Sequence, residues 1–589
     1  MNKESATHSA VFQVARIFFT GLVLFLVFIP LFRKPSLYRR YGGALDETQR
    51  VRLTEVSRLS GIHFRHGVDV DGYLQNRDLT HLGKWFESIS ASVSVVDING
   101  DGWPDIFLPS QKSGARSRLY INNKDGTFTD KASDYNIADL GSPTRAVFFD
   151  CDNSGKPAML VFNRSSTILY TQDRRGKYRI HGILDTGVGE FTGGVNILDI
   201  NKDGLLDIVV ASSGLEDLPN SMVNSDGGSS VQAFRNIGQC RFVKDDKLLA
   251  ESRPTHTHAL GVGDLRSRGR QDLWVASDFG NDRVFFDRGQ KFEATPSAIG
   301  KTLSNTGMTA EIAHLDAFPN PVVFVGHAYQ PGYFVGGNAL WTYDHGKFVN
   351  VARPLGVDRC GWAWGAKFAD LSNDGLLDLV VANGFISQTT GTPHGYWFKF
   401  ATLVSGPKFL SGRPNVWPPF LPNTRFTGPQ RDCVFINTGR GFVDVARDIG
   451  FDPDSHEGRG VAVIDFMNDG RLGLVVANQN QEPDLYRNDT PRRGSWIGFR
   501  LIGTKSNRDA IGAAVSALLD DGRILKRDKE PFNGYAAQSD GRIHFGLGTH
   551  RVDKIRIRWP SGLEETLDAP APGRYYTIVE GHGFREKAR

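Results

Sequence analysis

Cysteine is scarce in this chain of 589 residues: four are present, and no two are spaced as a Cys-x-x-Cys pair. That spacing is typical of zinc ribbons and thioredoxin-type redox sites, so both classes are excluded. Four thiols are too few to staple a chain of this length, but they allow one or two disulfides in an oxidising compartment. The sequence leaves the pairing open. The four are Cys151, Cys240, Cys360 and Cys433.

An excess of charge of one sign is also absent. Lys and Arg number 69 against 65 for Asp and Glu, which gives a formal net charge of +4. A balance this even carries no global signal for binding nucleic acid, and we expect no nucleic-acid partner. Hydrophobic residues make up 40% and charged residues 23% of the chain. These values exclude a multi-pass membrane protein and a disordered chain.

The short motifs of common enzyme classes are missing as well. Gly-x-Ser-x-Gly, His-Glu-x-x-His and a phosphate-binding P-loop are all absent. The closely spaced pair His256 and His258 alternates along a strand-like stretch, so both side chains share one face. Packing at a strand edge is the simple interpretation, and a metal or channel-lining site is the alternative.

One long apolar run stands near the start, at residues 17–32. With residues 11–16 it reaches about 22 residues, enough to span a bilayer. We predict a tail and an uncleaved membrane anchor over residues 1–40. A cleaved signal peptide and a buried core helix are the alternatives. Basic residues follow the run at 33–34 and 39–40. The positive-inside rule alone would therefore keep the body of the protein in the cytoplasm.

A repeat runs through the body of the chain. DINGDGWPD begins at Asp97, DINKDGLLD at Asp199 and DLSNDGLLD at Asp370. Each is followed by a short apolar run that predicts a β-strand. Weaker copies begin at Asp150, Asp264, Asp316 and Asp465, and successive starts lie 49 to 95 residues apart. A period of about 50–60 residues with about four strands per unit is typical of propeller blades.

These patterns predict an all-β fold: a seven-bladed β-propeller with a small C-terminal β-domain and an N-terminal transmembrane helix. The propeller is expected over 41–495, with an aromatic and Pro-rich insertion at about 385–431. A separate β-domain is expected over 496–581, followed by a tail at 582–589. Within that domain KIRIRW, residues 554–559, alternates as a half-buried strand. Its basic side chains are interpreted as a solvated face.

The three complete loops predict calcium sites. Oxygen donors stand at positions 1, 3, 5 and 9, and Gly stands at position 6, where it permits a sharp bend. Several hard oxygen donors around one centre select Ca²⁺ over transition metals. The alternative is a set of Asx turns without metal. In the Asp264 loop Arg266 stands at a donor position, so a cation side chain is expected to replace the metal there. The candidate ligands are Asp97, Asn99, Asp101 and Asp105; Asp199, Asn201, Asp203 and Asp207; and Asp370, Ser372, Asp374 and Asp378.

These loops resemble FG-GAP/VCBS repeats, as in integrin α-subunit propellers. GWAWGAKFADLSNDGLLDLVVANG, residues 361–384, is similar to the repeat of cartilage-acidic-protein-like proteins. SNRDAIGA at 506–513, HFGLG at 544–548 and IRIRWPSG at 555–562 resemble the ASPIC/UnbV domain that closes those proteins. The resemblance implies a secreted or surface propeller with calcium sites. Similar repeats in some carbohydrate lyases and dehydratases keep an enzyme interpretation open.

We therefore expect a single-pass, membrane-anchored protein whose body lies outside the cytoplasm, in the periplasm or at the cell surface. Plentiful extracytoplasmic calcium is the reason for preferring this side over the positive-inside rule. The expected function is binding or adhesion, with a protein or glycan partner held by the propeller face and the 385–431 insertion. One alternative is an enzyme of lyase or dehydratase type on a carbohydrate or other small polar substrate. Another is a structural subunit of an envelope complex.

Overall fold

A computed structural model describes most of the body of the chain. The described residues are 50–68, 88–89, 91–163, 166–186, 192–212, 230–250, 255–278, 282–289, 291–295, 299, 306–329, 336–385, 430–452, 455–491 and 494–585. The anchor expected within residues 1–40 and all but the ends of the 385–431 insertion lie outside them. Among the described residues no helix is both long enough and apolar enough to cross a membrane.

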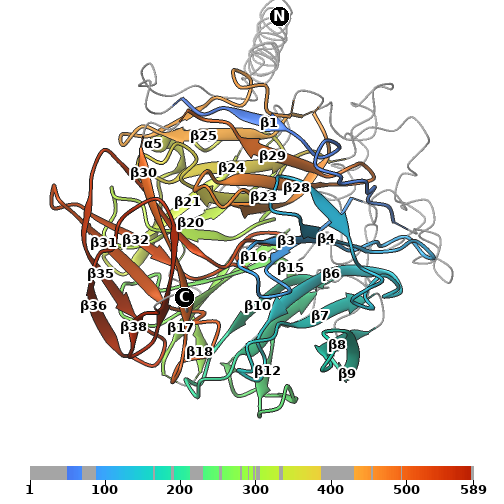
Figure 1. Cartoon of the computed structure of the whole chain (residues 1–589). Helices are drawn as coiled ribbons and strands as arrows, with labels where there is room; N and C mark the ends of the chain where they lie inside the picture. Colours follow the sequence, from blue (N-terminus) through green and yellow to red (C-terminus); the bar gives the residue numbers. More distant parts are fainter. Residues whose placement is uncertain are drawn as a thin grey trace, which may run out of the picture.

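Seven sheets, each built around a run of antiparallel strands, follow one another along the described chain (Figure 1). Sheets 1 to 3 are β2(Val93–Val96), β3(Asp105–Leu108), β4(Arg118–Asn122) and β5(Phe128–Asp130); β6(Pro143–Phe149), β7(Ala158–Asn163), β8(Thr167–Gln172) and β9(Tyr178–Leu184); and β10(Thr192–Leu198), β11(Asp207–Ser212), β12(Gln232–Asn236) and β13(Phe242–Lys244). Sheet 4 is β15(His256–Gly263), β16(Asp272–Asp278), β17(Arg283–Asp287) and β18(Phe292–Ala294), joined by β14(Leu249–Ala250).

The remaining three sheets complete the series. Sheet 5 is β19(Glu311–Ala313), β20(Val322–Val325), β21(Ala339–Asp344) and β22(Lys347–Asn350), followed by the short helix α5(Ala352–Leu355). Sheet 6 is β23(Ala363–Ala369), β24(Asp378–Asn383), β25(Cys433–Asn437) and β26(Phe442–Asp444). Sheet 7 is β27(Gly458–Ile464), β28(Gly473–Asn478) and β29(Asp484–Asn488), completed by β1(Leu53–Glu55) from the other end of the body.

The seven sheets close into a ring. The first strand of each sheet contacts the first strand of the next, and β27 of the last sheet contacts β2 of the first. Each sheet is covered on both faces by its neighbours, which explains its nearly continuous apolar runs. Phe107 of sheet 1, for example, packs edge-on against Phe148 of sheet 2 with ring centroids 5.5 Å apart. The fold is all-β and propeller-like, as the sequence predicts.

The first strand of the body closes this ring. β1 pairs antiparallel with β29, with Leu53 opposite Asn488 and Glu55 opposite Tyr486. It supplies the fourth strand of a sheet whose other three strands lie at the far end of the repeat. The two ends of the repeat region are therefore hydrogen-bonded to each other.

The C-terminal strands form two further sheets on one side of the ring, drawn in orange and red in Figure 1. One contains β34(Ile543–Gly548), β30(Ser495–Ile502), β37(Tyr575–Val579) and β38(Gly583–Phe584); the other contains β32(Ile524–Asp528), β31(Ala514–Leu519), β35(Val552–Arg558) and β36(Glu564–Asp568). In β35 Ile555 and Ile557 are buried while Lys554 and Arg556 are exposed, so the predicted alternation is confirmed.

A segment of this C-terminal region reaches into the ring. β33(Ala537–Gln538) pairs in parallel with β2. The side chain of Asn533 donates a 2.8 Å hydrogen bond to the carbonyl of Val262 in sheet 4.

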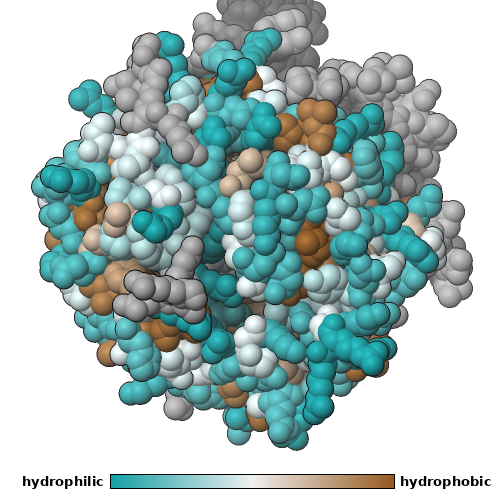
Figure 2. Space-filling view, in the orientation of Figure 1, coloured by the Kyte–Doolittle hydropathy of each residue, from teal (hydrophilic) through white to brown (hydrophobic). Residues whose placement is uncertain are grey.

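The outer surface seen in Figure 2 is mostly hydrophilic, with hydrophobic residues scattered over it. Most apolar side chains are therefore buried between the sheets rather than exposed on this surface.

Candidate cation-binding loops

Every one of the seven repeat loops joins the first strand of its sheet to the second. In the complete loop of sheet 1 the carboxylate of Asp97 accepts the amides of Asp101 at 3.0 Å and of Gly102 at 2.9 Å. Gly102 has a φ of +87°, a backbone conformation that suits glycine. The loops that begin at Asp199 and Asp370 repeat both hydrogen bonds. The position-1 carboxylate therefore holds the bend.

The last carboxylate of each complete loop ties it to the third strand of its sheet. Asp105 accepts the amide of Ile98 at 3.1 Å and the amide of Asn122, on β4, at 2.9 Å. Asp207 and Asp378 make the corresponding bonds in sheets 3 and 6. Each complete loop is thus one hydrogen-bonded unit with its sheet.

The remaining candidate ligands lie at the loop tips. Asn201 donates a 2.8 Å hydrogen bond to Asp203, and Asn99 makes the same contact with Asp101 at 3.3 Å. In the third loop Ser372 is buried, and its hydroxyl has no hydrogen-bond partner among the described residues. Oxygen donors therefore collect at the tip of each loop.

Burial makes the complete loops electrostatically costly. Burial, with Asp97 and Asp101 nearby, raises the pKa of Asp105 to about 7. Burial likewise raises the pKa of Asp207 to about 7, and burial with the adjacent Asp374 carboxylate raises that of Asp370 to about 7. A bound cation would offset this repulsion.

The donor chemistry of these loops fits Ca²⁺, since the side chains offer only hard oxygens. In the described part of the chain, three groups bring three or more Asp, Glu, His or Cys ligand atoms within 4.8 Å of one another. None of them includes a loop carboxylate. Binding would therefore require the loop side chains to turn inward, away from some of their amide partners.

The Asp264 loop carries its own cation. The guanidinium of Arg266 makes two hydrogen bonds, of 2.9 and 2.8 Å, to Asp272 at position 9. It also lies 3.8 Å from the ring centroid of Phe286. The side chains of Arg266 and Asp272 are 5% and 0% exposed. A cation side chain is thus paired with the position-9 carboxylate of this loop, as expected of a loop that needs no metal.

The Asp150 loop is held by other means. Its first carboxylate accepts the amides of Ser154 and Gly155, as in the complete loops. The backbone amide of Asp150 donates a 2.7 Å hydrogen bond to Asp509 of the C-terminal region. Cys151 forms a disulfide with Cys240 in sheet 3. Covalent and C-terminal contacts therefore fix this loop.

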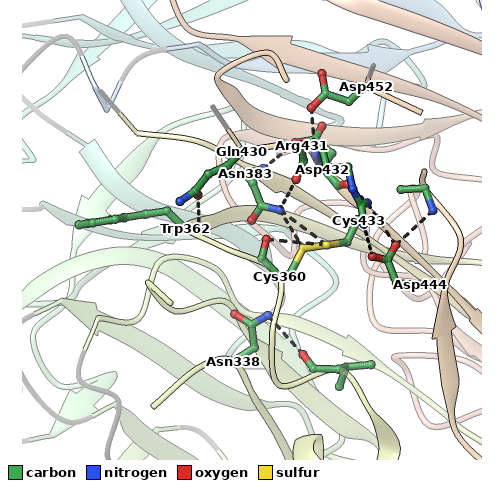
Figure 3. The surroundings of a disulfide bond; sticks show 12 residues. Asn338, Cys360, Trp362, Asn383, Gln430, Arg431, Asp432, Cys433, Asp444 and Asp452 are labelled. Carbon is green, nitrogen blue, oxygen red and sulfur yellow. Dashed lines mark hydrogen bonds and ion pairs between the residues drawn. A yellow bond between two sulfur atoms is a disulfide. The ribbon is translucent and has the colours of Figure 1, made fainter. Parts of the chain in front are cut away.

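A second disulfide braces the base of the insertion (Figure 3). Cys360 precedes the first strand of sheet 6, and Cys433 begins the third strand. Beside them the backbone amide of Asn383 donates a 2.6 Å hydrogen bond to the carboxylate of Asp432. The chain leaves the sheet after Asn383 and rejoins it at Cys433, directly after Asp432. Both ends of segment 386–429 are thus held at one place.

Aromatic stacking supports the same base. Phe385 stacks on Trp362 with ring centroids 4.4 Å apart and an interplanar angle of 12°. The backbone amide of Trp362 donates to the side chain of Gln430 at 2.7 Å (Figure 3). Trp362 and Trp364 are both buried.

Comparison with known families identifies two parts of this architecture. Residues 97–161 match the FG-GAP-like repeat, and residues 503–584 match the family described as ASPIC and UnbV. The chain carries an FG-GAP-like repeat and an ASPIC and UnbV domain. The resemblance to cartilage-acidic-protein-like proteins is thereby confirmed.

Curated relatives agree with this result. The chain is 25% identical to cartilage acidic protein 1 of Xenopus tropicalis over 245 residues, which is 37% of each protein. It is 25% identical to the Homo sapiens protein over 266 residues, 40% of this chain and 38% of that one. The matched region thus spans well under half of the relatives' length.

Solved structures are similar only in part. An Agrocybe aegerita lectin that recognises non-reducing terminal N-acetylglucosamine is 15% identical, with a TM-score of 0.36, over 62% of this chain and 84% of that one. A Bacillus licheniformis rhamnogalacturonan lyase is 13% identical, with a TM-score of 0.35, over 72% and 74%. Similarity at this level says nothing about a shared activity.

The ASPIC and UnbV domain contacts several of the repeat loops. Arg558, at the end of the basic strand, lies 3.0 Å from the carboxylate of Asp264. Tyr575 donates a 2.9 Å hydrogen bond to Asp465. Alternation alone assigns Arg558 to a solvated face, and no local signal in the sequence identifies its partner 294 residues away. The domain therefore supplies hydrogen-bond donors to two of the incomplete loops.

A cleft of about 590 Å³ remains between this domain and the first two sheets. Acidic Asp97 and Asp150 line one side, and basic Arg500, Lys529 and Arg542 also line it. Arg500 lies 3.5 Å from Asp97. The cleft is thus lined by charges of both signs.

Proposed function

We propose that this chain is a membrane-anchored, extracytoplasmic interaction module whose complete loops bind Ca²⁺. It holds a protein or glycan partner on the ring face that carries segment 386–429. The interaction role follows the FG-GAP-like repeat and the cartilage acidic protein relatives.

The observation that carries the proposal is the braced base of that segment. A disulfide, a hydrogen bond between Asn383 and Asp432, and the stacked pair Trp362 and Phe385 all meet where it leaves and rejoins the sheet. Long loops in compact domains are commonly binding elements. A rigid base lowers the entropy lost when such an element engages a partner.

The acidic loops and the base of segment 386–429 lie on opposite faces of the ring. The acidic loops join first to second strands, whereas segment 386–429 joins the second and third strands of sheet 6. In an antiparallel sheet these connections lie at opposite ends. The ASPIC and UnbV domain contacts the loop face, and we place the partner on the opposite face.

Chemistry supports the extracytoplasmic placement. Both disulfides suit an oxidising compartment, because cytosolic thiols are kept reduced. Calcium at millimolar levels outside the cytoplasm would fill sites of modest affinity.

The test replaces residues 386–429 by a short Gly-Ser linker. Chemical cross-linking on intact cells, with identification of the linked proteins by mass spectrometry, and a glycan array report binding by the full chain and by the deletion. We expect the partner or glycan to be lost with the deletion, while the thermal unfolding midpoint stays within a few degrees.

A control variant keeps the segment and changes the opposite face. Arg558→Ala removes a contact between the ASPIC and UnbV domain and the Asp264 loop, and it should leave capture unchanged. Capture by the deletion protein would contradict the placement of the partner. Absence of any specific partner or glycan for the intact chain would contradict the interaction function.

A further inference from the structure

The start of sheet 4 brings together three side chains with metal-binding chemistry. His256 and His258 lie on β15, and Asp278 is the last residue of β16. His256 is paired with Asp278 across the two strands, and the register shifts between Thr257 and Ala259. A bulge of this kind re-aims the side chain of the extra residue, here His258.

The geometry of the group is compact. Nε2 of His258 lies 3.5 Å from Oδ2 of Asp278, and the two imidazole ring centroids are 5.7 Å apart. One ligand atom from each of the three residues lies within 4.8 Å of the others. Tetrahedral zinc with bonds of about 2.0–2.1 Å holds its ligand atoms about 3.3 Å apart. Small side-chain rotations would therefore complete the site.

The surroundings of the group are closed rather than solvated. His256, His258 and Asp278 are 1%, 2% and 5% exposed. Nδ1 of His258 is buried and has no hydrogen-bond partner among the described residues. Nε2, the nitrogen that faces Asp278, is the one that a metal at this site would bind.

Two aromatic residues wall the group on the inside of the ring. Trp364 of sheet 6 meets the ring of His258 edge-on at 5.8 Å, and Tyr535 meets it at 6.2 Å. Tyr535 belongs to the C-terminal segment inside the ring, and its hydroxyl donates a 2.8 Å hydrogen bond to the carbonyl of Ile89. The packing limits the movement of His258.

We propose that His256, His258 and Asp278 bind one divalent transition-metal ion. Two imidazoles and one carboxylate suit zinc, cobalt or iron, whereas Ca²⁺ prefers oxygen donors alone. Three protein ligands leave a further position for water. This site is distinct from the acidic loops, because it lies at the opposite end of the sheet.

The site does not depend on the proposed function. A metal here would clamp the beginning of β15 to the end of β16. It would also fix the neighbourhood of Tyr535, where the C-terminal segment crosses the ring. The ion would thus serve the interior of the ring, whatever binds outside.

Cobalt is the probe for this site, because its visible absorption reports coordination by nitrogen and oxygen. The full chain, prepared without a histidine tag and stripped with a chelator, is titrated with Co²⁺ in excess Ca²⁺ so that the acidic loops do not compete. We expect one saturable absorption band per chain. Zn²⁺ should abolish the band by displacement.

The variants are His258→Gln and Asp278→Asn, with His66→Gln as the matched control. His66 is also buried, at 3% exposed, but belongs to no group of metal-binding side chains in the described part of the chain. We expect each site variant to weaken Co²⁺ binding at least tenfold and the control to bind as the unchanged chain does. The thermal midpoint in chelator verifies that each variant is folded.

Failure of the intact chain to show a saturable band in excess Ca²⁺ would overturn the proposal, whether or not the variants fold. An unchanged band in a folded His258→Gln/Asp278→Asn double variant would overturn it as well. Loss of the band in both single variants, but not in His66→Gln, would establish His258 and Asp278 as ligands and support the site.

Discussion

The complete loops and the Asp264 loop have the same backbone arrangement, but the negative charge of their carboxylates is balanced in different ways. In the Asp264 loop Arg266 is paired with buried Asp272, and Arg558 reaches Asp264 from the ASPIC and UnbV domain. In the complete loop of sheet 3, Asp199 and Asp207 are held by backbone amides, and burial raises the pKa of both. A repeat can therefore keep its shape while its charge is balanced by the protein itself or left for an ion.

The comparison also separates two kinds of dependence on the surroundings. A loop with an internal arginine is the same in every compartment, because its cation is covalently part of the chain. A loop that needs Ca²⁺ is stable only where calcium is present, and its stability grows with the concentration of the ion. Three such loops around one ring would make the whole fold responsive to calcium.

The largest expected effect breaks the complete loops. Asp101, Asp203 and Asp374 are changed together to Ala, and thermal unfolding is followed with calcium and with chelator. At calcium about 100-fold above Kd, three sites would stabilise the intact chain by roughly 8 kcal/mol. We expect a rise of several degrees with calcium in the intact chain and none in the triple variant.

The control for this experiment changes the same loop position in three incomplete repeats. Ser154, Arg268 and Asp469 are changed together to Ala, and the response to calcium should persist. If the intact chain unfolds at the same temperature with calcium and with chelator, the complete loops are turns only. The calcium argument for the extracytoplasmic side would then fall, and the positive-inside rule would regain its weight.

A smaller effect comes from the loop that carries its own cation. Arg266→Ala leaves the buried carboxylate of Asp272 without its partner, and we expect unfolding to become easier by about 3–5 kcal/mol. Urea denaturation measures this difference. The matched control is Arg235→Ala, which breaks the more exposed pair with Asp245 and should cost about 1 kcal/mol or less. Equal costs for the two variants would show that burial of Arg266 contributes nothing special.

The smallest effect concerns the domain that serves the incomplete loops. Although burial raises the pKa of Glu580, hydrogen bonds from Ser561, Ser506 and the Thr504 amide lower it to about 2. These bonds fix the stretch that carries Asp509 to the Asp150 loop. We expect Glu580→Gln to cost about 2 kcal/mol at neutral pH.

The pH dependence of that cost has a definite sign. A carboxylate with a lowered pKa stabilises the folded state above its unfolded pKa, about 4.3, and loses this contribution as the pH falls toward 2. The difference between the intact chain and Glu580→Gln should therefore shrink over this range in urea denaturation. A constant difference from pH 7 to pH 2.5 would contradict the role of the charge.

Local patterns predicted the repeating part of the fold. The apolar runs after the loops became strands such as β3 and β11, and the seven loop starts fall between the first two strands of the seven sheets. These features depend on residues close in sequence, such as the Gly that follows the tip in six of the seven loops. The role of the Arg266 cation in its loop could also be predicted from the sequence, because the spacing within one loop fixes which positions point at its centre.

Contacts between segments far apart in the sequence could not be predicted from such local patterns. The pairing of β1 with β29, the insertion of β33 beside β2, and the contact of Arg558 with Asp264 all join distant segments. Asp278 joins His256 and His258 only through the register of two strands, which the sequence does not specify. The anchor and the body of the insertion fall outside the described residues, so those predictions stand as predictions.

The position of β1 imposes an order of events on synthesis. Arg52 and Thr490, which share a hydrogen bond across the ring junction, are 438 residues apart. During translation β1 emerges first and has no strand to pair with until sheet 7 is complete. Its unpaired edge must stay apart from other strands for all that time, since exposed edges invite wrong pairing. The ring thus cannot close before sheet 7 has been made, and the long wait of β1 is a natural point at which a chaperone would act.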